Sequence, residues 1–292
     1  MTRRILRSIV AAAVVLMVPG AARGQAGQWT TARLPDGQPD IRGHWISDAV
    51  GGAHSVEDGR DPDADIVQGR AGEQNPVLIV EPADGRIPYL PAAAARRQQL
   101  LREIFTPTRR ERVDPHVRAL LDSVPRNNYV PGEMQILQVP GAVVILYESN
   151  HAYRVIPLDG RPHSPAQMKL WMGDSRGRWE GNTLVVDVTN FNEDTWLDSH
   201  GSVHSDALHV VERWTPVGPD RIDYAVTLED PKVFTRPWKM AFAINRNGDK
   251  TYEIFEDSRH EGERDVENIL SAGRREKAAG ITGIHEHRRE GR

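Results

Sequence analysis

The chain has 292 residues, of which 39% are hydrophobic and 27% are charged, and its net charge at pH 7 is −4. These values are typical of a globular protein and exclude a disordered or fibrous chain. Nucleic-acid-binding proteins usually carry a basic stripe, which an acidic chain without long runs of like charge does not offer. The absence of cysteine excludes disulfide bonds, a thiol nucleophile and a zinc site with cysteine ligands.

Residues 1–24 have the pattern of a cleavable signal peptide. Three arginines precede an apolar stretch over residues 9–18, and small residues follow it. This stretch is well short of the roughly 20 residues that span a bilayer, which favours cleavage near Gly24 or Ala26 over a membrane anchor. We therefore predict a periplasmic or secreted protein without a membrane span.

Residues 25–130 are predicted to form an N-terminal extension that contains the first strands and helices. Turn signals fill its beginning, and residues 50–74 are rich in Gly, Asp and Glu, as in a long loop. Pro91 followed by alanines is typical of a helix start. The elements expected in this region are strands at 41–46 and 77–80 and helices at 91–104 and 115–121.

Residues 131–280 are predicted to form a β-barrel core with a closing helix, followed by a charged tail at 281–292. Short apolar segments recur at even spacing between turns of Gly, Asn, Asp and Pro, and no βαβ rhythm is present. Such a pattern predicts a mainly β fold, an antiparallel barrel or strongly curved sheet of lipocalin-like type. The strands are expected at 134–137, 142–147, 153–158, 183–188, 207–214, 221–228, 238–244 and 251–255, and the helix at 265–279, with Val266, Ile269 and Leu270 as its buried stripe.

Two of these strands carry a carboxylate among apolar neighbours. Asp187 lies in the middle of one strand, on the same face as Thr189, and Glu212 shares a face with Val210 and Trp214. Because a buried charge is costly, Asp187 either lines a cavity or faces solvent. Glu212 either pairs with an arginine or has a raised pKa suited to proton transfer. The arginines that could pair with it are Arg154, Arg176 and Arg178.

Histidines supply the remaining titratable candidates. His204 is a candidate general acid or base because histidine titrates near neutrality, and His163, at a predicted turn, is a similar candidate. His200 and His204 could bind a metal together with a carboxylate, although the residues between them do not favour a helix. His260 and Glu261, before the final helix, could either meet a ligand at the barrel mouth or cap that helix.

The run from Gly173 to Val186, Gly-x-Ser-x-Gly-x-Trp-Glu-Gly-x-Thr-Leu-Val-Val, resembles the hallmark of a large family of exported bacterial proteins that has no established activity. The resemblance covers nearly all of the mature chain. Family members often carry a cysteine before the late Glu-Gly pair, where this chain has His260, so that a cysteine there is not essential to its chemistry. Separately, Gly43-x-Trp45 resembles the opening signature of lipocalin-like barrels and favours a barrel over a sandwich.

The first functional hypothesis is an enzyme of lyase, isomerase or cyclase type that acts on a small organic molecule without a nucleotide cofactor or a metal. In this hypothesis His204, Asp187 and Glu212 transfer protons and Arg176 holds an oxygen of the substrate. The substrate-binding candidates are Trp179, Thr189, Asn190, His163, His260 and Glu261.

Two alternatives remain open from the sequence. The first is a non-catalytic, lipocalin-like binder or carrier of an apolar or aromatic ligand, for which a barrel and tryptophans suffice. The second is a metal-dependent hydrolase. Convergence of Asp187, His204 and Glu212 around one cavity would favour the enzyme, whereas an apolar cavity lined by other residues would favour the binder.

Overall fold

The computed structural model of the protein describes residues 29–49, 53, 55–57, 77–104, 106–257 and 264–281. The chain divides into two units, residues 1–30 and 31–292, and the fold described below belongs to the second. Within the described residues, no helix is long and apolar enough to cross a membrane. The predicted signal peptide and the pair His260 and Glu261 lie outside the described residues.

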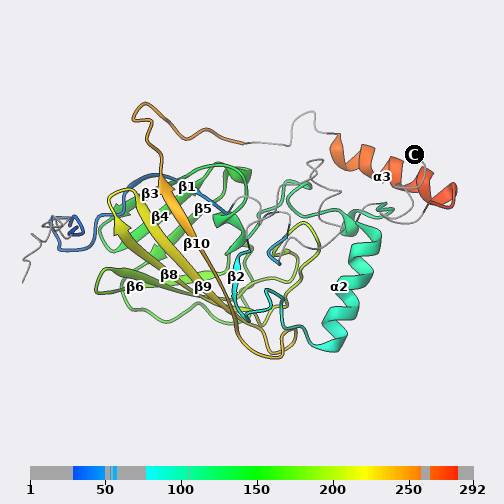
Figure 1. Ribbon diagram of the computed structural model, residues 1–292, viewed down its shortest axis with the longest axis horizontal. Helices are drawn as coiled ribbons and strands as arrows, with labels where there is room; N and C mark the ends of the chain where they lie inside the picture. The colour runs from blue at the N-terminus through cyan, green and yellow to red at the C-terminus, as the bar shows by residue number, and fades with distance from the viewer. Residues whose placement is uncertain are drawn as a thin grey trace, which may run out of the picture. The chain divides into compact units, whose positions relative to one another are not determined.

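One antiparallel sheet contains every named strand of the described chain (Figure 1). Its strands follow the order β5-β4-β3-β1-β10-β9-β8-β7-β6. The short β2 lies off this order and pairs with the first part of β10, whereas β1 pairs with the last part of β10. The first strand therefore lies between β3 and the last strand. The bounds are β1 Gly43–Ser47, β2 Ile79–Glu81, β3 Met134–Val139, β4 Ala142–Tyr147, β5 Tyr153–Pro157, β6 Asp174–Glu180, β7 Thr183–Thr189, β8 His209–Gly218, β9 Arg221–Glu229 and β10 Trp238–Arg246.

The sheet curls into a nearly closed barrel because its two end strands, β5 and β6, meet through side chains. Arg154 Nε donates a hydrogen bond of 2.9 Å to Ser175 Oγ across this boundary. A Cβ atom on Gly177 would lie 2.7 Å from both Ile156 and Leu158. No hydrogen-bonded ladder joins β5 to β6 in the described chain, and we call this boundary the seam.

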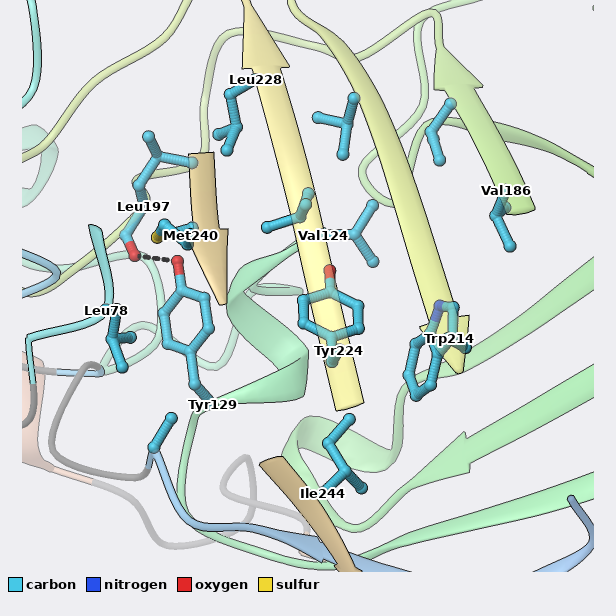
Figure 2. Close-up of a cluster of buried hydrophobic side chains, with 14 of the residues drawn as sticks. Leu78, Val124, Tyr129, Val186, Leu197, Trp214, Tyr224, Leu228, Met240 and Ile244 are labelled. Carbon is cyan, nitrogen blue, oxygen red and sulfur yellow. Dashed lines mark hydrogen bonds between the residues drawn. The ribbon is translucent and has the colours of Figure 1, made fainter. Parts of the chain in front are cut away.

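Large side chains fill the inside of the barrel. In β9, buried Ile222, Tyr224, Val226 and Leu228 alternate with exposed or half-buried neighbours, as a strand with one face in a core requires. The largest buried side chains are Trp45, Trp214 and Trp238. Figure 2 shows part of this core, in which the hydroxyl of Tyr129 donates to the carbonyl of Leu197 at 2.7 Å.

The described helices are α2, Pro91–Glu103, and α3, Asp265–Ala278, with short 3-10 turns at η2 Arg110–Arg112, η3 Arg126–Asn128 and η4 Ser149–His151. Pro91 is the first residue of α2, where its missing N–H is not needed. Gly273 of α3 lies against the backbone of residues 106 and 107, so closely that a Cβ atom would be 2.3 Å from the carbonyl oxygen of Pro107. Glycine is therefore what permits this approach.

The predicted fold class, a mainly β antiparallel barrel with an earlier and a later helix, is confirmed. Four details differ. Residues 115–119 form turns and residues 120–121 belong to no regular element, instead of a helix, because Ala119 has φ +56°. Residues 251–255 form no strand, and β6 covers residues 174–180, where no strand was predicted. The predicted stripe of α3 is only half-buried, and its buried residue is Gly273.

Candidate functional site

Glu212 lies inside the barrel, where its hydrogen bonds are satisfied by protein groups. It pairs with Arg154, and both side chains are at most 2% exposed. Asn128 Nδ2 and the Tyr224 hydroxyl donate to Glu212 Oε1 at 3.0 and 2.9 Å. Burial and the neighbouring carboxylate raise the pKa of Tyr224, which stays protonated as a donor. Of the three arginines considered, Arg154 is therefore the partner, and Glu212 belongs to a closed structural network.

Asp187 lies on the opposite, outer face of the barrel. It accepts hydrogen bonds from His163 Nε2 at 2.8 Å and from His209 Nε2 at 3.0 Å. His163 Nδ1 in turn contacts Asp174 at 2.8 Å, and Arg176 contacts the same carboxylate at 2.9 Å. Three predicted residues, Arg176, His163 and Asp187, thus come together in one chain of polar contacts, with Asp174 and His209 as members that the sequence reasoning missed.

This outer chain keeps its carboxylates ionised. Burial alone would raise the pKa of Asp187, but the hydrogen bonds from His209 and His163 outweigh it and lower the pKa below its usual value. The pKa of Asp174 is likewise lowered, because the Ser164 N–H and His163 outweigh burial. Within the described residues no group of three or more His, Cys, Asp or Glu is arranged to hold a metal ion.

His204 lies apart from both groups, in the connection between β7 and β8. Its side chain is buried, its Nε2 accepts from the Thr195 hydroxyl at 2.6 Å, and its Nδ1 donates to the Ser205 carbonyl at 3.0 Å. Burial, the largest effect, lowers the pKa of His204. A neutral histidine with both ring nitrogens occupied inside the protein has a structural role here.

The stability of the protein is expected to fall as the pH drops below about 6.5, because His204 stays neutral in the folded state. Below its ordinary pKa of 6.5 the unfolded chain binds a proton that the folded chain does not, so acid favours unfolding. Urea unfolding at pH 8.0 and 5.5 measures the change. His204→Gln should show a smaller change between the two pH values, and an equal change would contradict the assignment.

The remaining predicted residues lie along β6 and β7. Trp179 packs against the core and donates from Nε1 to Gln38 at 2.9 Å. Thr189 ends β7 opposite Asp174. Asn190 Nδ2 donates to the carbonyls of Ser164 and Pro165 at 2.9 and 3.2 Å. Asn190 therefore holds a loop in place, and Asp187, His204 and Glu212 do not surround a common cavity.

A pocket of about 560 Å³ lies at the end of the seam where β5 and β6 begin. This volume is typical of a small-molecule site. We call the pocket the seam pocket. Its lining comes from three stretches, one before the barrel, one around η4 and the start of β5, and one directly before β6. The lining residues are Ala119, Leu120, Leu121, Asn150, His151, Ala152, Tyr153, Leu170, Trp171, Met172 and Gly173.

The lining is apolar and aromatic, and it contains no Asp, Glu, Lys or Arg. Tyr153 is 67% exposed at the edge of the pocket, Leu170 is 37% exposed, and Trp171 and Met172 are half-buried. Exposed large apolar side chains that gather beside a hollow indicate a binding surface. Asn150 and His151 are the polar residues of the lining, beside the hydroxyl of Tyr153 and the indole N–H of Trp171.

The outer chain of Asp and His residues holds one wall of this pocket. The 158–173 loop connects β5 to β6, and its last four residues line the pocket. His163 is fixed between Asp174 and Asp187, Arg176 Nε donates to the Pro162 carbonyl at 3.0 Å, and Asn190 holds the next turn. The predicted residues of β6 and β7 thus act on the pocket by positioning this loop.

Every non-glycine residue with a positive φ in the described chain lies in or beside the seam pocket. Ala119, Asn150 and His151 line it with φ of +56°, +51° and +40°. Ser123, at φ +70°, follows the first lining stretch, and Asn190, at φ +61°, accepts the N–H of the third stretch through its carbonyl. Residues held in such conformations gather at functional sites.

The sequence reasoning missed the lining residues. The signal that could have found them is the run Leu170-Trp171-Met172, three large apolar side chains in a stretch that is otherwise polar and belongs to no predicted strand. The polar run Ser149-Asn150-His151, between two apolar strands, is a second signal, because a left-handed conformation favours asparagine.

Comparison with known proteins finds few likenesses. No protein-family model and no curated protein matches the chain. Among solved structures, the wild-type fluorescent protein UnaG is similar at 11% identity and a TM-score of 0.25, over 45% of this chain and 86% of that one. A point mutant of UnaG gives 11% and 0.26, over 50% and 90%. Both TM-scores are below 0.5, and the barrel is therefore assigned from the strand pairing of this chain.

Proposed function

We propose that this protein binds a small neutral molecule, apolar or aromatic, in the seam pocket. The observation that carries the proposal is an apolar pocket without Asp, Glu, Lys or Arg, whose lining therefore includes neither Asp187 nor Glu212, nor His204. This is the arrangement expected of a binder, whereas the enzyme hypothesis needs these three groups around one cavity. The barrel core is filled with side chains, so the proposed site is at the seam instead of in the middle of the barrel.

The charge of the lining supports a neutral ligand. An ion that enters a pocket without a counter-charge loses hydration and gains no partner, whereas an apolar molecule gains from leaving water. Trp171 and Tyr153 offer flat faces for an aromatic ring, and Met172 adapts to irregular shapes. We also propose that binding takes place after export, on the strength of the signal-peptide pattern in residues 1–24.

Replacing Trp171 with alanine is expected to weaken binding of the neutral dye N-phenyl-1-naphthylamine about tenfold, because an aromatic contact and its buried area are lost. Titration of the dye, followed by its fluorescence, measures the dissociation constant. The control is Phe255→Ala, which removes an aromatic side chain that is 62% exposed and does not line the pocket. Equal affinities in wild type and Trp171→Ala would contradict the proposed site.

The same experiment separates binding from catalysis. A binder releases the compound unchanged after prolonged incubation, with a stoichiometry of one per chain. Conversion of a captured compound would instead support the enzyme hypothesis.

A further inference from the structure

A second pocket, of about 250 Å³, is lined by the last turn of α2, by residues that follow α2 and by the last turn of α3. We call it the basic pocket. Every residue of its lining is polar, and three of the six are cations at pH 7. It shares no residue with the seam pocket. The lining residues are Arg102, Glu103, Thr106, Thr108, Arg109 and Lys277.

The three cations of the basic pocket have no anionic partner. Within the described chain, neither an ion pair nor a side-chain hydrogen bond engages Arg102, Arg109 or Lys277, and all three are exposed. Glu103, the acid of the lining, is already taken by Arg112 at 2.7 Å and by Gln99 Nε2 at 3.2 Å. Three cations and one carboxylate give the lining a charge of +2, although the whole chain has a net charge of −4.

The frame of the basic pocket is held together by close packing. Gly273 of α3 approaches the backbone that follows α2, where a Cβ atom would be 2.3 Å from the carbonyl oxygen of Pro107. Arg274 Nε donates to the carbonyl oxygen of Thr108 at 3.4 Å. The frame therefore keeps the cations around one hollow, where like charges repel one another. An anion placed among them would remove this cost.

From these observations we propose that the basic pocket binds the phosphate group of a small soluble anion. A phosphate group carries a charge of about −1.5 to −2 at pH 7, which matches the charge of the lining. Its oxygens accept from several directions at once, and arginine is well suited to bind them. The volume is below the roughly 300–1,000 Å³ of sites for drug-sized ligands, so any organic part attached to the phosphate is small.

Titration of ¹⁵N-labelled protein with inorganic phosphate, at an ionic strength kept constant with sodium chloride, tests the proposal. The amide signals of Thr106 and Thr108 report from the lining and are expected to shift to saturation. Phosphate should bind about fivefold more tightly than acetate, because one further unit of charge at about 4 Å in water changes an affinity by that factor. Equal affinities, or the absence of a saturable shift at these amides, would overturn the proposal.

The double variant Arg109→Gln with Lys277→Gln removes cations that come from two separate stretches of the lining. We expect it to weaken phosphate binding about twentyfold, since each lost unit of charge accounts for about a factor of five. The matched control, Arg236→Gln with Lys250→Gln, changes the net charge equally at exposed positions outside the lining and should keep the affinity. An equal loss in both double variants would trace binding to the overall charge and would overturn the site.

Two further ligands identify the source of the phosphate group. Glycerol 3-phosphate, a small soluble ester, should shift the same two amides at least as strongly as inorganic phosphate does. Vesicles that contain phosphatidic acid should not capture the protein. Capture by these vesicles without binding of either soluble compound would overturn the proposal. Binding of N-phenyl-1-naphthylamine in the seam pocket should be unchanged in Arg109→Gln with Lys277→Gln, so a failure at the basic pocket leaves the proposed function standing.

Discussion

Replacing Arg154 with methionine is expected to lower the free energy of unfolding by about 3–5 kcal/mol, the range found when one partner of a buried ion pair is removed. Methionine fills much of the same space, but the carboxylate of Glu212 stays inside the barrel without its cation. Asn128 and Tyr224 alone then face it. Ser175 loses its contact as well, and with it the hydrogen bond across the seam. Urea denaturation followed by tryptophan fluorescence measures the loss.

The double variant Arg154→Met with Glu212→Gln tells charge apart from packing. Glutamine keeps an oxygen for Asn128 and Tyr224 but has no charge to bury. We therefore expect the double variant to be more stable than Arg154→Met alone, with about half of the loss recovered. If the two variants were equally unstable, the cause would be lost packing at Arg154 instead of the unpaired carboxylate.

Gly173→Ala is expected to cost about 2–5 kcal/mol of stability and to weaken ligand binding. Gly173 has φ +66°, which costs an alanine about 1–2 kcal/mol. A Cβ atom there would also lie 2.7 Å from Phe191 and from Val188, and such overpacking adds about 1–3 kcal/mol. Gly173 lines the seam pocket. A backbone shift that relieves the clash with Phe191 and Val188 would therefore move the wall of the pocket.

The matched control is Gly181→Ala, in the turn between β6 and β7. Gly181 has φ +62°, but a Cβ atom there would meet nothing within 4 Å. This variant therefore carries the conformational cost alone, about 1–2 kcal/mol, and should leave dye binding unchanged. Thermal or urea unfolding gives both stabilities. A similar loss in the two variants would show that the contacts of Gly173 do not matter.

The barrel could be predicted because alternation is a local property of each strand. Val210, Glu212 and Trp214 do share an inner face, as the pattern of residues indicated. The relation between strands could not be predicted in the same way. Val186 lies opposite Glu212 in the observed register, so that Asp187, the next residue, faces outward. The hypothesis that Asp187 and Glu212 act in one cavity is therefore wrong.

The seam pocket could not be predicted, because its lining is assembled from three stretches far apart in the chain. None of them has helical or strand periodicity along its length: residue 119 ends a turn and 120–121 belong to no regular element, 150–153 run from a distorted 3-10 turn into the first residue of β5, and 170–173 end a loop. The block from Gly173 to Asn190, which contains several predicted site residues, does lie next to the pocket. Its members Arg176, Asp187 and Asn190 proved to anchor the 158–173 loop instead of meeting in a cavity.

The place of β1 in the sheet has a consequence for how the molecule is assembled. Trp45 lies opposite Met134 on one side and Arg246 on the other. During synthesis, β10 must therefore be made, long after β1 and β3, before β1 can gain its second neighbour. Such distant pairing delays completion of the cylinder until the last strand has been made, and we expect this protein to fold slowly compared with helical proteins of similar size.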